Sequence, residues 1–242
     1  MARRPAPDRT PLRRERILRA ALELADEGGA GALTMQTIGD RLGVEAMSLY
    51  RHVRNKEDLL DGLVDLVFEE IEVPEGRPDW LAALRDRSLS ARTALRRHPW
   101  AIGLMESRMA PGPANLRSHD RTLRILVDAG FTAAAATHAY NLLDSYILGF
   151  ALQEANLPFD SAVELAEMGD VLLAQVPADT YPTFVSVSRE LLASGFDYAA
   201  EFEFGLDLIL DGIERMRSAQ PRGPALPRRP ERAKDARAAN PR

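Results

Sequence analysis

The sequence predicts an all-α protein with a small three-helix head at its N-terminus and a larger helical domain behind it. Apolar residues recur every three or four positions, which is typical of helices packed on a core. No alternating strand pattern persists from residue 56 to 217. Prolines divide this long segment into helix-sized pieces: Pro74, Pro78, Pro99, Pro111, Pro113, Pro158, Pro177 and Pro182.

The first helix of the head follows a short Arg/Pro-rich segment, residues 1–9, which we expect to be a flexible basic arm. Thr10 is placed to cap this helix, with Pro11 at its first position. Gly28 and Gly29 mark its end. Between these signals, apolar residues at helical spacing form one buried stripe: Ile17, Leu18, Ala21, Leu22 and Ala25.

Two short helices joined by a tight turn are predicted next. Thr34 can cap the segment "MQTIGDRL", and Gly43 follows where the turn needs a positive φ. A third helix is predicted from Glu45 to Val53. Asn55 can then cap a fourth helix, whose first turn carries Glu57 and Asp58. We assign residues 10–60 to the head and 61–217 to the larger domain.

The third helix has an unusual exposed side. Leu49 and Val53 turn inward, so Met47, Ser48, Tyr50 and Arg51 turn outward. Helix, turn, helix, braced by a preceding helix, is the arrangement whose second helix lies in the DNA major groove. Serine and arginine can hydrogen-bond base edges or phosphates, and methionine can contact a thymine methyl group. Thr34 and Lys56, at helix N-termini, suit phosphates. The alternative is a small helical bundle with a polar surface.

Charge is distributed in agreement with a nucleic-acid contact at the front of the chain. The net charge is −5 overall, yet residues 1–56 carry 11 Lys/Arg against 7 Asp/Glu. Residues 57–217 carry 13 against 27, and the Pro/Arg-rich tail 218–242, expected to be disordered, carries 7 against 2. An acidic body with a basic head indicates that only the head meets a polyanion.

Two segments of the larger domain, 132–156 and 199–217, are apolar on more than one side. In the second segment, Phe204 and Leu208 form a second apolar face beside the one that contains Phe202 and Leu206. A helix that is apolar on two faces buries one in its own core and needs a partner for the other. Gly149 and Gly205 would allow close helix approach. We therefore predict a homodimer; the alternative is two core helices of a monomer. The expected interface residues are Tyr146, Gly149, Phe150, Phe202, Gly205, Leu206, Ile209 and Ile213.

Residues 33–64, "LTMQTIGDRLGVEAMSLYRHVRNKEDLLDGLV", resemble the DNA-binding segment of the tetracycline-repressor (TetR) family. The matching marks are Leu33-Thr34, Gly43-Val44, Leu49-Tyr50, His52-Val53, Asn55-Lys56 and Leu59-Leu60. The resemblance implies phosphate contacts by Thr34, Tyr50, His52 and Lys56. It implies base contacts by Gln36, Ala46, Met47 and Ser48. Ala46 and Met47 differ from the tetracycline repressors, so their operator sequence does not transfer to this chain.

The resemblance extends to the larger domain, through "RRHPWAIGLM", "RILVDAGFTAAAATHAYNLLDSYILGFALQE" and "FEFGLDLILDGIERM". In that family the helices matching 132–156 and 199–217 form a four-helix dimer bundle. The same domain usually holds a small effector, whose binding moves the fourth helix and changes the spacing of the two heads. The residues expected to line such a site are Trp80, Trp100, Met105, Met109, Tyr140, Asp144 and Ile147. Core packing is the alternative for each, although a carboxylate such as Asp144 needs a partner there.

The effector itself is expected to be mainly apolar and to bind without a metal. A histidine and a glutamate help to hold magnesium in the tetracycline repressors, and the matching positions here are Met105 and Gln153. Methionine is a poor magnesium ligand and glutamine carries no charge. Recognition of a metal–tetracycline complex is therefore not expected.

Other classes of function lack their usual signatures. The chain has no cysteine, its histidines lack paired metal-ligand spacing, and it has no G-x-S-x-G motif, so neither an enzyme nor a cofactor or metal site is predicted. No apolar run reaches the roughly 18 residues of a membrane span, and we expect a cytoplasmic protein. The main prediction is an effector-controlled repressor that binds an operator on double-stranded DNA. Two alternatives to it remain. They are a DNA-binding architectural or partner-controlled regulator without a ligand, and a protein–protein adaptor.

Overall fold

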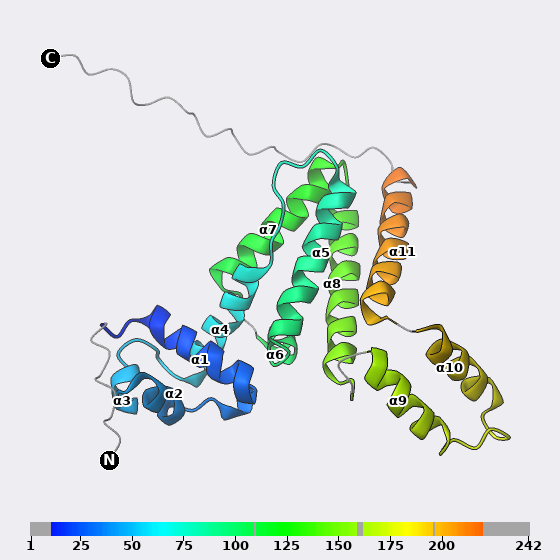
Figure 1. The fold of residues 1–242 in the computed structure, drawn as a ribbon. Helices are drawn as coiled ribbons and strands as arrows, with labels where there is room; N and C mark the ends of the chain where they lie inside the picture. Colours follow the sequence, from blue (N-terminus) through cyan, green and yellow to red (C-terminus); the bar gives the residue numbers. More distant parts are fainter. Residues whose placement is uncertain (1–10, 109, 159–161, 196, 220–242) are drawn as a thin grey trace.

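The computed structural model describes residues 11–108, 110–158, 162–195 and 197–219. Within these ranges the secondary structure is α-helix with one short 3₁₀ turn and no strand, so the predicted all-α class is confirmed (Figure 1). A small head lies at one end, α4 leads out of it, and an upright bundle containing α5, α8 and α11 forms the body. The predicted basic arm and nearly all of the predicted disordered tail lie outside the described residues.

The head begins with α1 (Arg14–Gly28), which ends where the sequence predicted, at Gly29 with φ 74°. Its start differs from the prediction. The backbone at Arg13 is extended, with φ −137° and ψ 156°, so the helix begins at Arg14 and Pro11 precedes it. Thr10, the predicted cap, lies outside the described residues. A 3₁₀ turn, η1 (Ala30–Ala32), then leads to the second helix.

The helix-turn-helix follows as predicted, apart from the length of its second helix. Thr34 caps α2 (Met35–Leu42) by accepting a hydrogen bond from the Thr37 N–H, and Gly43 adopts the left-handed conformation with φ 69°. The second helix, α3, covers only Ala46–Leu49 and not Glu45–Val53. The chain turns after Leu49 because it must reach the extended backbone of Asn55, which caps α4 (Lys56–Glu70) by accepting from the Asp58 N–H.

Helix α4 belongs to both parts of the molecule. Its Leu59 and Leu63 pack in the head with residues such as Ile17, Ile38 and Leu49. One and two turns later, Val67 and Ile71 pack in the core of the body. The boundary that we expected at residue 60 therefore falls inside a continuous helix.

The body contains seven further helices among the described residues: α5 (Trp80–Arg97), α6 (Ala101–Ser107), α7 (Pro113–Asp128), α8 (Ala133–Ala155), α9 (Ala162–Leu173), α10 (Pro182–Ser194) and α11 (Tyr198–Ala219). Each of the predicted proline breaks lies between helices or at the first residue of one. Helices α5, α8 and α11 share a core in which Leu143, Phe202 and Leu206 are fully enclosed. The α9–α10 pair lies to one side of this bundle (Figure 1).

Candidate nucleic-acid interface and ligand site

The residues predicted to contact DNA lie on the surface of the head. Leu49 and Val53 are buried, with at most 1% of either side chain exposed, and this orients their neighbours outward. Met47 keeps 73% of its surface exposed and Tyr50 keeps 47%, unusual values for side chains of this size. Thr34, Gln36, Arg51 and Lys56 are also exposed, and Ala46, Ser48 and His52 are half-buried. All nine predicted side chains are thus at least partly accessible.

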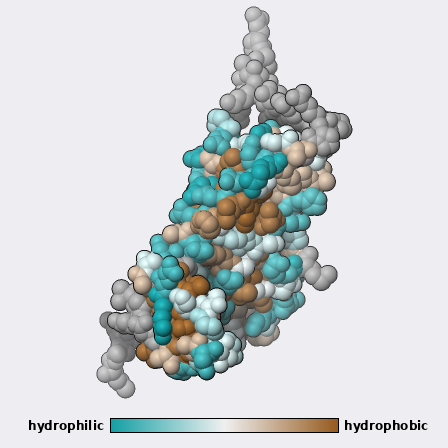
Figure 2. Space-filling model, turned by 90° about the vertical axis from the view of Figure 1, so that its right-hand side faces the viewer, coloured by the Kyte–Doolittle hydropathy of each residue, from teal (hydrophilic) through white to brown (hydrophobic). Residues whose placement is uncertain are grey.

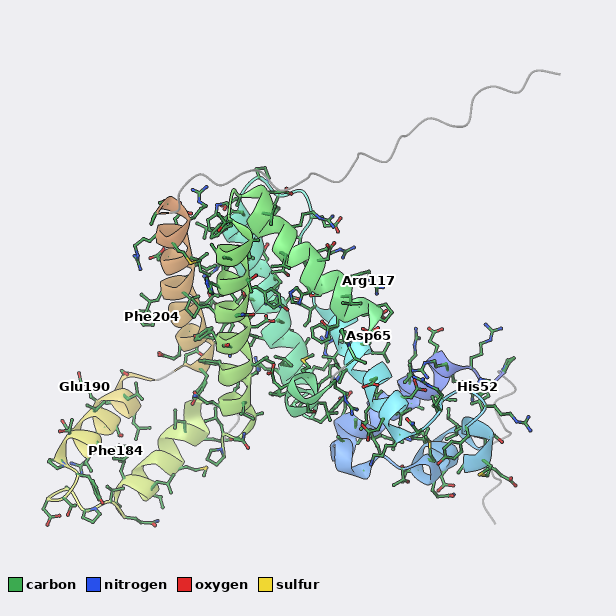
Figure 3. All side chains as sticks on the ribbon, turned by 180° about the vertical axis from the view of Figure 1, so that it is seen from behind. His52, Asp65, Arg117, Phe184, Glu190 and Phe204 are labelled. Carbon is green, nitrogen blue, oxygen red and sulfur yellow. The ribbon has the colours of Figure 1, made fainter. Side chains whose placement is uncertain are left out.

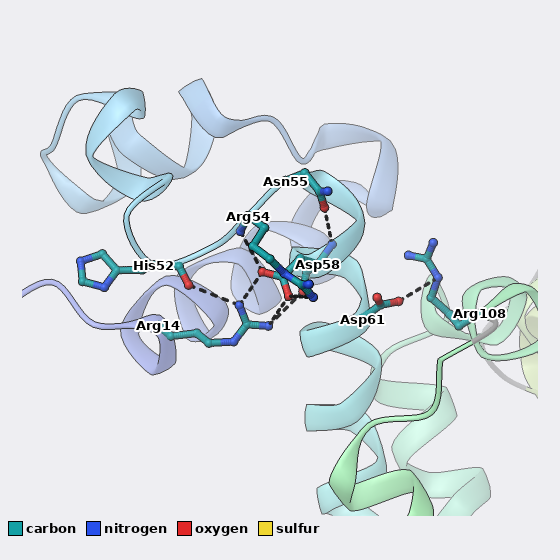
Figure 4. A network of polar contacts seen from close by, with 7 residues as sticks. All are labelled: Arg14, His52, Arg54, Asn55, Asp58, Asp61 and Arg108. Atoms are coloured by element: carbon teal, nitrogen blue, oxygen red, sulfur yellow. Dashed lines mark hydrogen bonds and ion pairs between the residues drawn. The ribbon is translucent and has the colours of Figure 1, made fainter.

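A buried carboxylate holds the end of α3 and the start of α4 in place (Figure 4). Arg14 on α1 donates from Nη1 and Nη2 to the Asp58 carboxylate at 2.8 and 3.2 Å, and the Arg54 N–H donates to it at 2.9 Å. Arg14 also reaches the His52 carbonyl at 3.4 Å. These hydrogen bonds, those from Arg14 above all, outweigh desolvation and lower the pKa of Asp58 from 3.8 to about 2. These contacts therefore hold in place the backbone that carries His52 and Lys56.

Two of the contacts that tie α4 to the body are made by acidic side chains near the middle of this helix. Arg108, just after α6, pairs with Glu57 and lies with its Nε 3.2 Å from Asp61 Oδ1 (Figure 4). One turn further, Asp65 accepts hydrogen bonds from the Ala114 and Asn115 N–H groups at 2.8 and 3.0 Å. Asp65 of α4 (labelled in Figure 3) thereby caps the N-terminus of α7, a different helix. A displacement of α6 or α7 would accordingly pull on α4.

A second set of contacts connects the head and the body near the end of α5. His98 is 1% exposed, and its Nδ1 and Nε2 lie 2.6 Å from Asp26 and 3.2 Å from Glu70. Trp100, expected to line a ligand site, donates from its indole N–H to the same Asp26 oxygen at 2.7 Å. The indole N–H of Trp100 is therefore committed to the contact with α1.

The other predicted ligand residues lie on several different helices of the body. Trp80 borders a cleft of about 340 Å³ between the α4–α5 connection and the end of α7. Tyr140, Asp144 and Ile147 lie on successive turns of α8, and Met105 is half-buried on α6. Met109 lies outside the described residues. Trp80 packs edge-on against Phe131 at 5.3 Å.

Asp144 has the partner that the sequence required. Arg87 of α5, whose side chain is 3% exposed, lies with Nη1 2.6 Å from Asp144 Oδ1. Burial, and then the negative charge of Asp144, raise the pKa of the Tyr140 phenol well above its usual value. Tyr140 in turn stacks on His119 of α7, with ring centroids 4.0 Å apart. Arg87 and His119 were missed from the sequence, although an arginine within the apolar stripe of α5 was a usable signal.

The predicted dimer interface needs a correction. Phe150, Phe202, Leu206 and Ile213 are at most 9% exposed in a single chain, so their side chains are not available to a partner. Tyr146 is half-buried, and its hydroxyl donates to the Phe202 carbonyl at 3.0 Å. Gly205 sits beneath that Tyr146 ring, so its lack of a side chain serves packing within the chain. Ile209 is half-buried, and of the eight predicted interface residues only Gly149 is exposed.

An accessible apolar surface lies instead on the opposite side of α11 and on α10. Phe204 and Leu208 are 61% and 56% exposed, and Phe204 projects away from the bundle (Figure 3). Phe184 and Val187 of α10 are 58% and 59% exposed. Figure 2 shows apolar side chains gathered over this face. Phe204 and Leu208 form the second apolar face that the sequence indicated, and it is this face that remains open to a partner.

The described residues lack two features of other classes of protein. No helix there is long and apolar enough to cross a membrane. The same residues include no group of three or more histidine, cysteine, aspartate or glutamate side chains placed to hold a metal ion.

Comparison with known proteins identifies the family. Residues 17–63 match the model of bacterial regulatory proteins of the tetR family, and residues 73–217 match that of the tetracyclin repressor-like C-terminal domain. The HTH-type transcriptional repressor DrrR1 of Streptomyces coeruleorubidus is 33% identical, covering 93% of this chain and 86% of the relative. The class C tetracycline repressor of Escherichia coli is 32% identical, with 85% and 92% covered.

Solved structures agree with this assignment. Apo ActR from Streptomyces coelicolor superimposes with a TM-score of 0.73 at 28% identity, covering 87% of this chain and 99% of ActR. ActR in complex with actinorhodin gives a TM-score of 0.71 at 29% identity, with 86% and 99% covered. The family binds operator DNA and small-molecule effectors, typically as dimers. The chain therefore belongs to the TetR family of ligand-responsive DNA-binding transcriptional regulators, and it is not an enzyme.

Proposed function

We propose that this protein represses transcription by binding a palindromic operator as a homodimer, and that a small, mainly apolar effector releases it. The observation that carries the DNA-binding part is the exposed set on α3 and the turn after it, above all Met47 and Tyr50. Large side chains that are exposed beside Lys56 and Arg51 fit base edges and phosphates. As a DNA-binding regulator it would act in the cytoplasm.

The dimer would form through the open apolar face of α11. Phe204 and Leu208 are two of the most exposed large apolar side chains of the body, and Leu142 and Leu152 of α8 are 48% and 53% exposed. Pairing of two such faces would bury them in a bundle of four helices. Two-fold symmetry would then place the two heads on half-sites about one turn of DNA, roughly 34–36 Å, apart.

The effector would bind in the body, and its signal would reach the heads through α4. ActR has been solved with actinorhodin and with (S)-DNPA, and a TetR variant from Acinetobacter baumannii with minocycline. Arg108 contacts α4 at Asp61, and one turn later Asp65 of α4 binds the N-terminus of α7. A shift of α6 or α7 on effector binding would tilt α4 and change the separation of the heads, so that one half-site is lost.

A selection from a pool of random DNA duplexes tests the proposal. Purified protein is incubated with the pool, bound duplexes are amplified over several rounds, and the enriched sequences are read. We expect an enriched palindrome that binds two protomers. Enrichment of an asymmetric site bound by one protomer would contradict binding as a homodimer. A pool that stays random would contradict sequence-specific binding.

A further inference from the structure

One carboxylate oxygen of the head is contacted by two side chains of the body. His98, just after α5, is 1% exposed, and its Nδ1 lies 2.6 Å from Asp26 Oδ1 on α1. The indole N–H of Trp100 donates to the same Asp26 oxygen at 2.7 Å. Asp26 is therefore a single point at which the head is attached to the end of α5 and the start of α6.

The body's side of this contact is held in place by its own neighbours. His98 Nε2 lies 3.2 Å from Glu70 Oε1 at the end of α4, and Arg97 pairs with the same Glu70 carboxylate. The rings of His98 and Trp100 pack edge-on, with their centroids 6.0 Å apart. Both ring nitrogens of His98 thus face carboxylates, so the imidazole is fixed between α1 and α4.

The place of Asp26 matters because it is not on the connecting helix. The contacts of Asp61 with Arg108 and of Asp65 with α7 are made by α4 itself. A single helix that joins two cores can bend or twist, and contacts made by that helix leave the rest of the head free to turn about it. Asp26 lies near the end of α1, a different helix of the head. A contact there restrains the angle between the head and the body.

The chemistry of the contact suits an orienting role. Hydrogen bonds to a carboxylate are about twice as strong as those between neutral groups, and they weaken steeply when donor and acceptor move out of line. Apolar packing has no such direction. Trp100 packs against the apolar cores of both the head and the body. Asp26 therefore adds a direction to a joint that apolar packing alone would allow to slide.

We propose that Asp26 is a positioning residue that sets the angle between head and body, and thereby the spacing of half-sites that the dimer accepts. In a two-fold dimer the paired bodies carry both heads, so the angle within each chain decides the distance between the two α3 helices. The part of this inference that concerns half-sites rests on the proposed operator binding as a homodimer. The part that concerns the angle within one chain does not.

A distance measurement within single chains tests the angle without DNA. The chain has no cysteine, so Arg19→Cys on α1 and Ala134→Cys on α8, both at exposed positions, can carry two spin labels. Labelled chains are refolded with an excess of unlabelled chains, so that double electron–electron resonance reports distances within one chain. We expect one narrow distance distribution when Asp26 is present and a broader or displaced distribution for Asp26→Ala.

Three further variants assign the effect to the shared oxygen. Asp26→Asn keeps an oxygen that both body side chains can reach, so it should keep the narrow distribution. Trp100→Phe keeps an aromatic ring but removes the N–H, and it should broaden the distribution as Asp26→Ala does. Glu27→Ala is the matched control: it removes the neighbouring carboxylate of α1, which pairs with Arg41 inside the head, and should change nothing.

Duplexes of different spacing test the consequence for DNA. The selected palindrome is compared with the same palindrome carrying one extra central base pair, which moves one half-site by about 3.4 Å and turns it by about 35°. A single half-site is the third duplex. We expect Asp26→Ala to lose about tenfold in affinity for the palindrome and to bind the half-site within about twofold of wild type. The extra base pair should cost Asp26→Ala about threefold less in affinity than it costs wild type.

The two measurements can contradict the inference separately. Identical distance distributions with and without Asp26→Ala would overturn it, as would an equally large change in Glu27→Ala. An equal loss of affinity on all three duplexes would show that Asp26 serves folding and does not set the spacing. If wild type selects no palindrome, the proposed operator binding fails, and the distances within one chain still decide whether Asp26 sets the angle. If Asp26→Ala does not fold by circular dichroism, Trp100→Phe decides the matter.

Discussion

Replacing Asp58 with asparagine should destabilise the head by an amount that depends on pH. The carboxylate holds Arg14 of α1 and the Arg54 N–H, and its pKa falls from 3.8 to about 2 on folding. Each pKa unit corresponds to about 1.4 kcal/mol, so ionised Asp58 contributes about 2 kcal/mol at neutral pH. Asparagine keeps the size of the side chain but loses the charge.

The sign of the pH dependence follows from the direction of the pKa change. Because folding lowers the pKa, the contribution is fully present above about pH 5 and is lost as pH falls towards 2. By about pH 3 roughly half of it should be gone. Wild type and Asp58→Asn are compared by urea unfolding at equal protomer concentration, followed by circular dichroism between pH 7 and pH 3.

A matched control separates this effect from a general loss of surface charge. Glu15→Gln removes an exposed pair with Arg19, in which both side chains are about 70% exposed, and should change the unfolding free energy by less than about 0.5 kcal/mol. The reasoning is refuted if Asp58→Asn is as mild as this control at pH 7, or if its cost does not decrease between pH 7 and pH 3.

Three further substitutions test the contacts around α4 and the surface of α11. Arg108→Ala removes the contacts of α6 with Glu57 and Asp61, and the affinity for the selected duplex, measured by fluorescence anisotropy, should fall about threefold or more. Gly112→Ala places a methyl group onto the Asp65 carboxylate that caps α7, so the free energy of unfolding in urea should fall by about 1–3 kcal/mol. Leu208→Glu puts a charge on the open face of α11, and sedimentation should show monomers.

Each of these substitutions has a matched control in the chain. Arg124→Ala breaks an exposed pair with Asp120 within α7 itself, and a loss of DNA affinity equal to that of Arg108→Ala would contradict the coupling role. At Gly103 a methyl group would meet nothing within 4 Å, so Gly103→Ala should be mild. Leu116 is as exposed as Leu208, so Leu116→Glu is the matched control for Leu208→Glu. If dimers survive both substitutions, the interface lies elsewhere.

Local signals in the sequence were enough for most helices. Gly29, Gly43 and the cap at Thr34 act through the backbone of their own neighbours, and each stands where its type predicted. The length of α3 was not predictable in this way. Its end depends on how the chain reaches the Asn55 cap and on the contacts of Arg14 with Asp58, which bring together residues 44 positions apart.

The candidate sites were predictable only in part, for the same reason. Exposure of Met47 and Tyr50 followed from helical spacing around Leu49, a local property. The packing of α8 decides which side of α11 faces the core of its own chain. The predicted interface therefore included Phe202 and Leu206, which are buried, and left out Phe204 and Leu208, which are exposed. The Arg87–Asp144 pair likewise joins helices that are distant in sequence.

The central claim is that the exposed surface of α3 and the start of α4 reads a two-fold symmetric DNA site. The most direct measurement is a fluorescence anisotropy titration of wild type, Tyr50→Ala and Lys56→Ala against the selected palindrome and against a single half-site of equal length. We predict tight binding of two wild-type protomers to the palindrome, a large loss on the half-site, and weaker binding by both variants. Unchanged affinity in both folded variants, or equal affinity for palindrome and half-site, would contradict the account.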